Sequence, residues 1–78
     1  MRSLPLELLI DILLECAAEN ALGAHRAQQM GGIITAADLE GIAFGYYASA
    51  RLLADNADWP LFRDWMGELV AVESRRVA

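Results

Sequence analysis

The sequence predicts an all-α fold, a small bundle of three helices that becomes four if the first helix divides. Two short breaks, residues 30–32 (Met-Gly-Gly) and 55–58 (Asp-Asn-Ala-Asp), separate three stretches of the 78-residue chain. Each stretch carries apolar residues at helical spacing among good helix formers. The apolar fraction is 56%, above the roughly 45–50% of typical domains, and a short chain has little interior to hold the excess. We therefore expect a single domain, residues 1–78, that packs as a homodimer.

The first helix is expected over residues 5–29. Pro5 suits a first helical turn and Ser3 can cap it, while the following glycine pair ends the helix. Residues 20–23 (Asn-Ala-Leu-Gly) are its weak point and could split it in two. Its predicted inner side consists of Leu6, Leu9, Ile10, Leu13, Cys16, Ala17, Ala21 and Ala24. An acidic edge at spacing four is formed by Glu7, Asp11, Glu15 and Glu19.

The second helix is expected over residues 36–54 and should be the central, most buried one. Thr35 is a good N-cap, and Asp38 stands where a capping box places its acidic residue. Charged residues within the helix body, Glu40 and Arg51, occupy one narrow strip. The predicted inner face, opposite that strip, consists of Leu39, Ile42, Tyr46, Ala50 and Leu53.

Small residues recur at every fourth position of this helix. They are Ala37, Gly41, Gly45 and Ser49. An interior glycine costs a helix about 1 kcal/mol relative to alanine, so such a row indicates that another backbone approaches closely. The row predicts a close-packing groove, whose mate is either the alanine-rich segment 17–27 or helix two of a second copy.

The third helix is expected over residues 59–75, with Asp58 as its cap. Its pattern has an apolar inner side and a charged outer side. The predicted inner side consists of Leu61, Phe62, Trp65, Met66, Leu69 and Val72. With this helix on one side and the first on the other, helix two would be sandwiched.

Composition and residue spacing argue against several classes of function. The formal net charge is −5, with six arginines and no lysine, which disfavours direct nucleic-acid binding. Cys16 and His25 are the only residues of the soft metal-ligand types, so we expect no metal and no cofactor. No set of polar groups converges in the pattern, so we expect no enzymatic activity. No apolar stretch reaches the ~20 residues that span a bilayer, and we expect a soluble, cytoplasmic protein outside the membrane.

Two tyrosines leave one alternative open. Tyr46 and Tyr47 lie on the second helix and could line a pocket between helices in a ligand-binding subunit or enzyme. Tyrosines beside glycine on a buried helix are more often part of the core. A dimeric transcription-associated regulator is a further alternative, against which the negative charge argues.

The segment from Ser3 to Leu14, which reads SLPLELLIDILL, resembles the opening of an F-box. The residues that match the pattern of that family are Leu4, Pro5, Glu7, Ile12 and Leu13. The resemblance implies an adaptor that docks through its N-terminal helix. The rest of the chain departs from the pattern, because the usual basic-aromatic middle segment is missing and the glycine pair falls where the second F-box helix would run.

The function that the sequence favours is a small interaction protein: a regulator, inhibitor or adaptor. It would bind a protein partner, whose identity the sequence does not indicate, through apolar residues on an acidic helical surface. Leu8 and Leu22 fall among the acidic residues, where a core of the same chain does not easily reach them. Trp59 stands at the start of the expected third helix and suits an interface anchor. The predicted contacts are Leu8, Ile12, Leu22 and Trp59.

Overall fold

The computed structural model describes residues 4–55 and 58–77, with residue 77 described by its backbone alone. All regular structure in this part of the chain is helical: α1 (Leu4–Gln29), α2 (Ile33–Ala54) and α3 (Phe62–Val77). The three predicted helices are confirmed. α1 runs unbroken through residues 20–23, so no fourth helix forms there. The proposed Ser3 cap, and residues 56–57 of the second break, lie outside the described residues.

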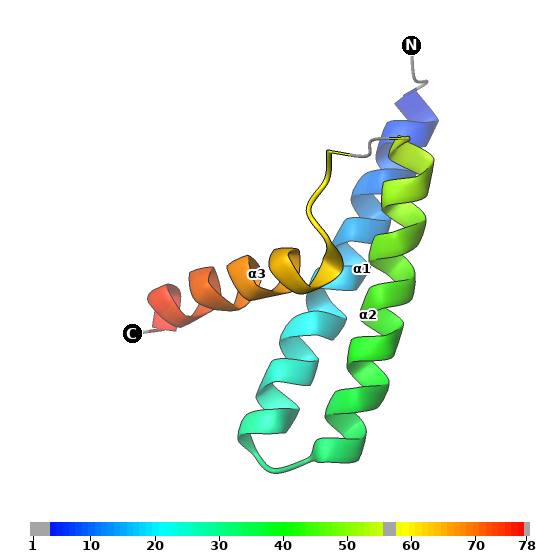
Figure 1. Cartoon of the computed structure of the whole chain (residues 1–78). Coiled ribbons are helices and arrows are strands. Elements are labelled where there is room, and N and C mark those ends of the chain that lie inside the picture. The colour runs from blue at the N-terminus through cyan, green and yellow to red at the C-terminus, as the bar shows by residue number, and fades with distance from the viewer. Residues whose placement is uncertain (1–3, 56–57, 78) are drawn as a thin grey trace.

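The first two helices form a long antiparallel hairpin, and α3 leaves it at a steep angle (Figure 1). The hairpin reverses at the predicted glycine pair, where Gly31 takes the left-handed conformation with φ +83°. The carbonyl oxygen of Ala27 accepts hydrogen bonds from the backbone N–H groups of Met30 and Gly32. Such bonds satisfy carbonyls that a helix C-terminus leaves open, and glycine adopts the required φ without steric cost.

The predicted start of α2 is wrong by three residues. α2 begins at Ile33, its N-cap is Gly32, and no side chain makes a capping hydrogen bond. Thr35 therefore lies inside the first turn, where it is exposed, and the capping box with Asp38 is not the start signal. The reason is the left-handed Gly31, which reverses the chain tightly enough for helix geometry to resume at once.

The contact between α1 and α2 is made mainly by alanine. The buried apolar residues of the described chain are Ile10, Ala17, Ala21, Ala24, Ala36, Ala43, Tyr47, Ala50 and Ala54. Two rows at a strict spacing of seven face each other in this seam: Ile10, Ala17 and Ala24 on α1; Ala36, Ala43 and Ala50 on α2. A heptad spacing keeps one side of a helix against its partner, and methyl side chains let two helices pack closely.

The predicted inner face of α2 is consequently rotated from the observed one. Of that set only Ala50 is buried; Leu39 and Tyr46 are half-buried, and Ile42 and Leu53 are exposed. The prediction places the largest side chains in the core, whereas the seam selects alanine and leaves the larger residues at its margin. On α1 the predicted inner side contains all four buried residues, Ile10, Ala17, Ala21 and Ala24. Its larger members lie at the margin of the seam, because Leu9 is exposed and Leu13 and Cys16 are half-buried.

The position of α3 also differs from the prediction. α2 packs chiefly along α1, and α3 makes sparser contacts with both, so α2 is not sandwiched between them. α3 begins at Phe62, three residues later than expected, and Asp58 is not its cap. Its inner side is half-buried at Phe62, Trp65, Met66 and Leu69, but Leu61 and Val72 are exposed. An ion pair joins the Arg26 guanidinium of α1 to the Glu73 carboxylate of α3 at 3.4 Å.

Candidate protein-interaction site

The surface of the described chain carries many large apolar side chains. Thirteen are exposed: Leu4, Leu8, Leu9, Ile12, Met30, Ile33, Ile34, Ile42, Phe44, Leu52, Leu53, Leu61 and Val72. Single exposed leucines need no explanation, but contiguous apolar patches mark interaction sites. The helical positions of these residues separate two such patches on the hairpin.

The first patch, here called the outer strip, consists of Leu4, Leu8 and Ile12 on α1. Leu8 and Ile12 are each 54% exposed, and spacing four aligns all three along the helix. This side of α1 faces away from the alanine seam. Asp11, Glu15 and Glu19 are exposed alongside it, so the outer strip combines apolar and acidic groups.

The other two predicted contacts lie elsewhere. Leu22 is half-buried on the continuous α1. Trp59 is half-buried as well, and it packs against the cluster formed by Ile10, Ala50 and Ala54. Its ring centroid lies 6.0 Å from that of Tyr47. The four predicted contacts are therefore not brought together. Leu8 and Ile12 share one exposed surface, and Leu22 and Trp59 lie outside it.

The small-residue row of α2 points away from α1. Ala37, Gly41, Gly45 and Ser49 are all exposed, and a Cβ built on Gly41 or Gly45 would meet nothing within 4 Å. The alanine-rich segment 17–27 is thus not the mate of this row. That segment packs instead against the heptad alanines Ala36, Ala43 and Ala50 of α2, of which the predicted inner face contains only Ala50.

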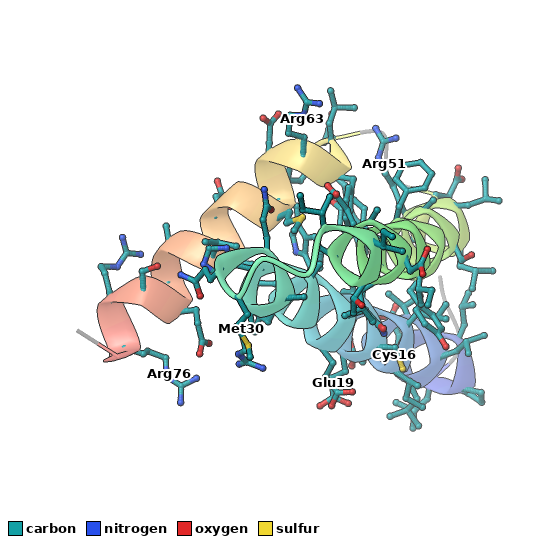
Figure 2. All side chains as sticks on the ribbon, turned by 90° about the horizontal axis from the view of Figure 1, so that it is seen from below. Cys16, Glu19, Met30, Arg51, Arg63 and Arg76 are labelled. Carbon is teal, nitrogen blue, oxygen red and sulfur yellow. The ribbon has the colours of Figure 1, made fainter. Side chains whose placement is uncertain are left out.

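The second patch, here called the open face, lies on the side of the hairpin away from α3. It consists of Leu9, Leu13 and Cys16 of α1 and Leu39, Ile42, Tyr46 and Leu53 of α2. A Cβ built on Gly23 would lie 3.3 Å from Leu39 Cδ1, so this leucine closes over α1 on that side. Figure 2 shows Cys16 and the α3 residue Arg63 projecting from opposite sides of the molecule.

Aromatic rings hold α3 on the covered side of the hairpin. Tyr47 is buried and stacks on Trp65 with ring centroids 4.6 Å apart. Phe44 and Phe62 meet edge to face at 5.5 Å. Beside these rings lies an open cavity of about 540 Å³, lined by Phe44, Tyr47, Ala48, Arg51, Leu52, Asp55, Leu61 and Phe62. Of the two tyrosines predicted for a pocket, only Tyr47 lines it, because Tyr46 lies on the open face.

Tyr47 also ties the α2–α3 connection to the hairpin. Its hydroxyl donates a 2.6 Å hydrogen bond to the carbonyl oxygen of Pro60. Burial raises the pKa of the Tyr47 phenol, the Glu68 carboxylate raises it further, and the Arg51 guanidinium opposes both. The neutral phenol is the form that donates this bond, so the surroundings stabilise its protonated state.

The described residues also bear on catalysis, metal binding and membrane insertion. Cys16 and His25 lie nine residues apart on one unbroken helix, about 180° around its axis, so they do not form a nucleophile–base pair. Within residues 4–55 and 58–77, His, Cys, Asp and Glu form no group that could hold a metal ion. None of the described helices has the length and apolar character needed to cross a membrane.

Comparison with known proteins gave no match to a family model, to a curated protein or to a solved structure. The function of this chain is therefore inferred from the chemistry of its surfaces.

Proposed function

We propose that this chain is a small non-enzymatic interaction module that binds a protein partner through the outer strip. The observation that carries the proposal is the aligned exposure of Leu4, Leu8 and Ile12 beside acidic residues. Fully burying an exposed leucine or isoleucine side chain gives roughly 1.5–3 kcal/mol. Leu8 and Ile12 are each 54% exposed, so each would gain about half of that, and several such side chains together would drive binding.

Charge indicates the kind of partner that would fit. The chain has a formal net charge of −5, and Asp11, Glu15 and Glu19 flank the outer strip. A partner segment with apolar residues flanked by arginine or lysine would complement both features. The acidic residues beside the outer strip would repel other proteins whose own surfaces are acidic. An amphipathic helix presents such a pattern along one side.

The proposal includes self-association. The solvent-accessible surface of the chain is 5588 Å², whereas a folded monomer of 8.5 kDa is expected to have about 4,700 Å². The difference, about 900 Å², is close to the ~800 Å² that each partner buries in a standard interface. A homodimer would remove this excess while leaving the outer strip for the partner.

The decisive experiment compares two substitutions of the same kind. Leu8→Glu places a charge within the outer strip, whereas Ile34→Glu places it on an exposed isoleucine at the far end of the hairpin. Tagged chains would be purified from the native host, and the affinity for any stoichiometric partner would be measured by calorimetry. We expect Leu8→Glu to weaken binding about 30-fold or more, the effect of losing ~2 kcal/mol at an interface hot spot.

Ile34→Glu should leave the affinity unchanged. Both variants should unfold within about 0.5 kcal/mol of the wild type, because neither side chain is buried. A partner that binds both variants equally would show that the outer strip is not its site. A chain that never retains a partner would remove the interaction function itself.

A further inference from the structure

We propose that the open face is the surface through which two copies of this chain associate, hairpin against hairpin, into a bundle of four helices with α3 on the outside. This inference rests on the self-association in the proposed function and names the surface that carries it. It differs from the sequence-based expectation, which placed the close contact in the small-residue row.

The side chains of the open face have the same spacing of seven residues as those of the alanine seam. Leu39, Tyr46 and Leu53 are spaced by seven residues on α2, and Leu9 and Cys16 have the same spacing on α1. Heptad spacing keeps each set on one side of its helix, next to the buried row. The hairpin thus presents a second, parallel set of side chains with the same period, and a second hairpin would match it.

The covered and open sides of α2 point in opposite directions. Phe44 packs on Phe62 of α3, and Leu53 lies nine residues later, about 180° around the helix axis. α3 therefore shields the Phe44 side and leaves Leu53 to solvent, with 38% of its surface exposed. Ile42, on the same open side, is 48% exposed.

The open face is uncharged along the described hairpin. The positions that fall on this side are residues 5, 9, 13, 16, 20, 23 and 27 of α1 and 35, 39, 42, 46, 49 and 53 of α2, and none is Asp, Glu, Lys, Arg or His. Ile12 of the outer strip and Asp38 of α2 lie just outside this sector. The acidic residues of α1 lie on its other sides. For a chain of net charge −5, this is the face on which two copies can meet without bringing acidic groups together.

Two polar residues at this face bond to their own helix. The Asn20 Nδ2 donates to the Cys16 carbonyl oxygen at 2.8 Å. The Ser49 hydroxyl donates to the Gly45 carbonyl oxygen at 2.8 Å. Burying these donors against an apolar surface leaves neither bond broken, so the desolvation cost of covering the face is lowered.

The size of the face suits a dimer of this chain. The positions of the open face on α1, residues 5–27, span about 33 Å, and two adjacent helices are about 20 Å wide. Their product is roughly 660 Å², within the approximately 600–1,000 Å² that each partner buries in a standard interface. A basic partner segment, by contrast, would find no carboxylate on this face to pair with, which favours a second copy as its occupant.

The test is the native mass of the full chain by sedimentation equilibrium over a range of concentrations. We expect the wild type to approach twice the 8.5 kDa chain mass. Ile42→Arg combined with Leu53→Arg should shift the dissociation constant at least 100-fold, because two charges would be buried without partners. Far-UV circular dichroism must show that helix content is retained, and Ile42→Ser with Leu53→Ser provides a milder variant if it is not.

The matched control places large side chains on the other candidate surface, the small-residue row of α2. Gly41→Leu combined with Gly45→Leu adds bulk where a Cβ meets nothing within 4 Å, so the monomer tolerates it, but a backbone could no longer approach the small-residue row. We expect this variant to remain a dimer. A dimer that survives the arginine changes but not the leucine changes would overturn the open face and leave self-association standing.

A wild type that is monomeric at every concentration would overturn the dimer altogether. The loss of partner binding in Leu8→Glu would then still support the outer strip, since that substitution lies on a different side of α1. The arginine variants thus test the open face, and Leu8→Glu independently tests the outer strip.

Discussion

The two sides of the hairpin differ in how completely they are packed. On one side, α3 covers α2 with Phe62 and Trp65, and the buried Tyr47 joins rings and backbone through its hydrogen bond to Pro60. On the other side, leucine, isoleucine and tyrosine lie at the same helical period with no further helix of the described chain over them. The third helix therefore covers only one of the two sides of the hairpin.

The largest effect is expected on the covered side. Tyr47→Ala removes the ring that contacts Trp59, Phe62 and Trp65 and should lower the free energy of unfolding by about 3–5 kcal/mol. The comparator is Tyr46→Ala, which removes the same side chain from the open face. At concentrations where the chain is monomeric, its cost in urea unfolding should be much smaller, since Tyr46 is only half-buried. Equal costs would contradict the difference between the two sides.

A smaller effect is expected from the Tyr47 phenol at alkaline pH. Its pKa is raised from 10.0 by burial and by Glu68, against the effect of Arg51. The folded state therefore holds this proton more tightly than the unfolded state does. Stability from this source is fully present below about pH 10 and is lost as the pH rises through the folded pKa.

The free energy of unfolding, measured by urea denaturation on either side of pH 10, should thus fall more steeply in the wild type than in Tyr47→Phe. The phenylalanine variant should also lose about 1 kcal/mol at neutral pH, with the hydrogen bond to the Pro60 carbonyl. If the free energy of unfolding of both proteins depends on pH in the same way, the Tyr47 proton does not contribute to stability.

The sequence predicted the elements better than it predicted their faces. The glycine pair and the acidic break located all three helices, and the continuous α1 ends close to its predicted residue. The α2 boundary was missed because Thr35 matches a cap by type, whereas the backbone at Gly31 sets the start of the helix. A cap residue alone does not report where the preceding turn ends.

The predicted buried face of α2 is wrong because the prediction relies on side-chain size. The predicted core contains Leu39, Ile42 and Leu53, because large side chains gain most from burial. The signal that identifies the true seam was present: Ala36, Ala43 and Ala50 are spaced by seven, as are Ala17 and Ala24. Of the candidate site, the sequence predicts that Leu8 lies outside the core, and the structure exposes it. The spacing of four that puts Ile12 on the same surface is visible in the sequence, whereas the half-buried positions of Leu22 and Trp59 depend on how the chain packs around them.

The most direct measurement of the central claim uses the single cysteine as a probe of the open face. Cys16 is half-buried in one chain, so its thiol should react with an alkylating reagent in the monomer. We expect the alkylation rate of the wild type to fall as the protein concentration rises through the dimerisation range, and we expect Ile42→Arg with Leu53→Arg to remove this dependence. An alkylation rate that stays constant while the native mass doubles would show that the two copies meet elsewhere.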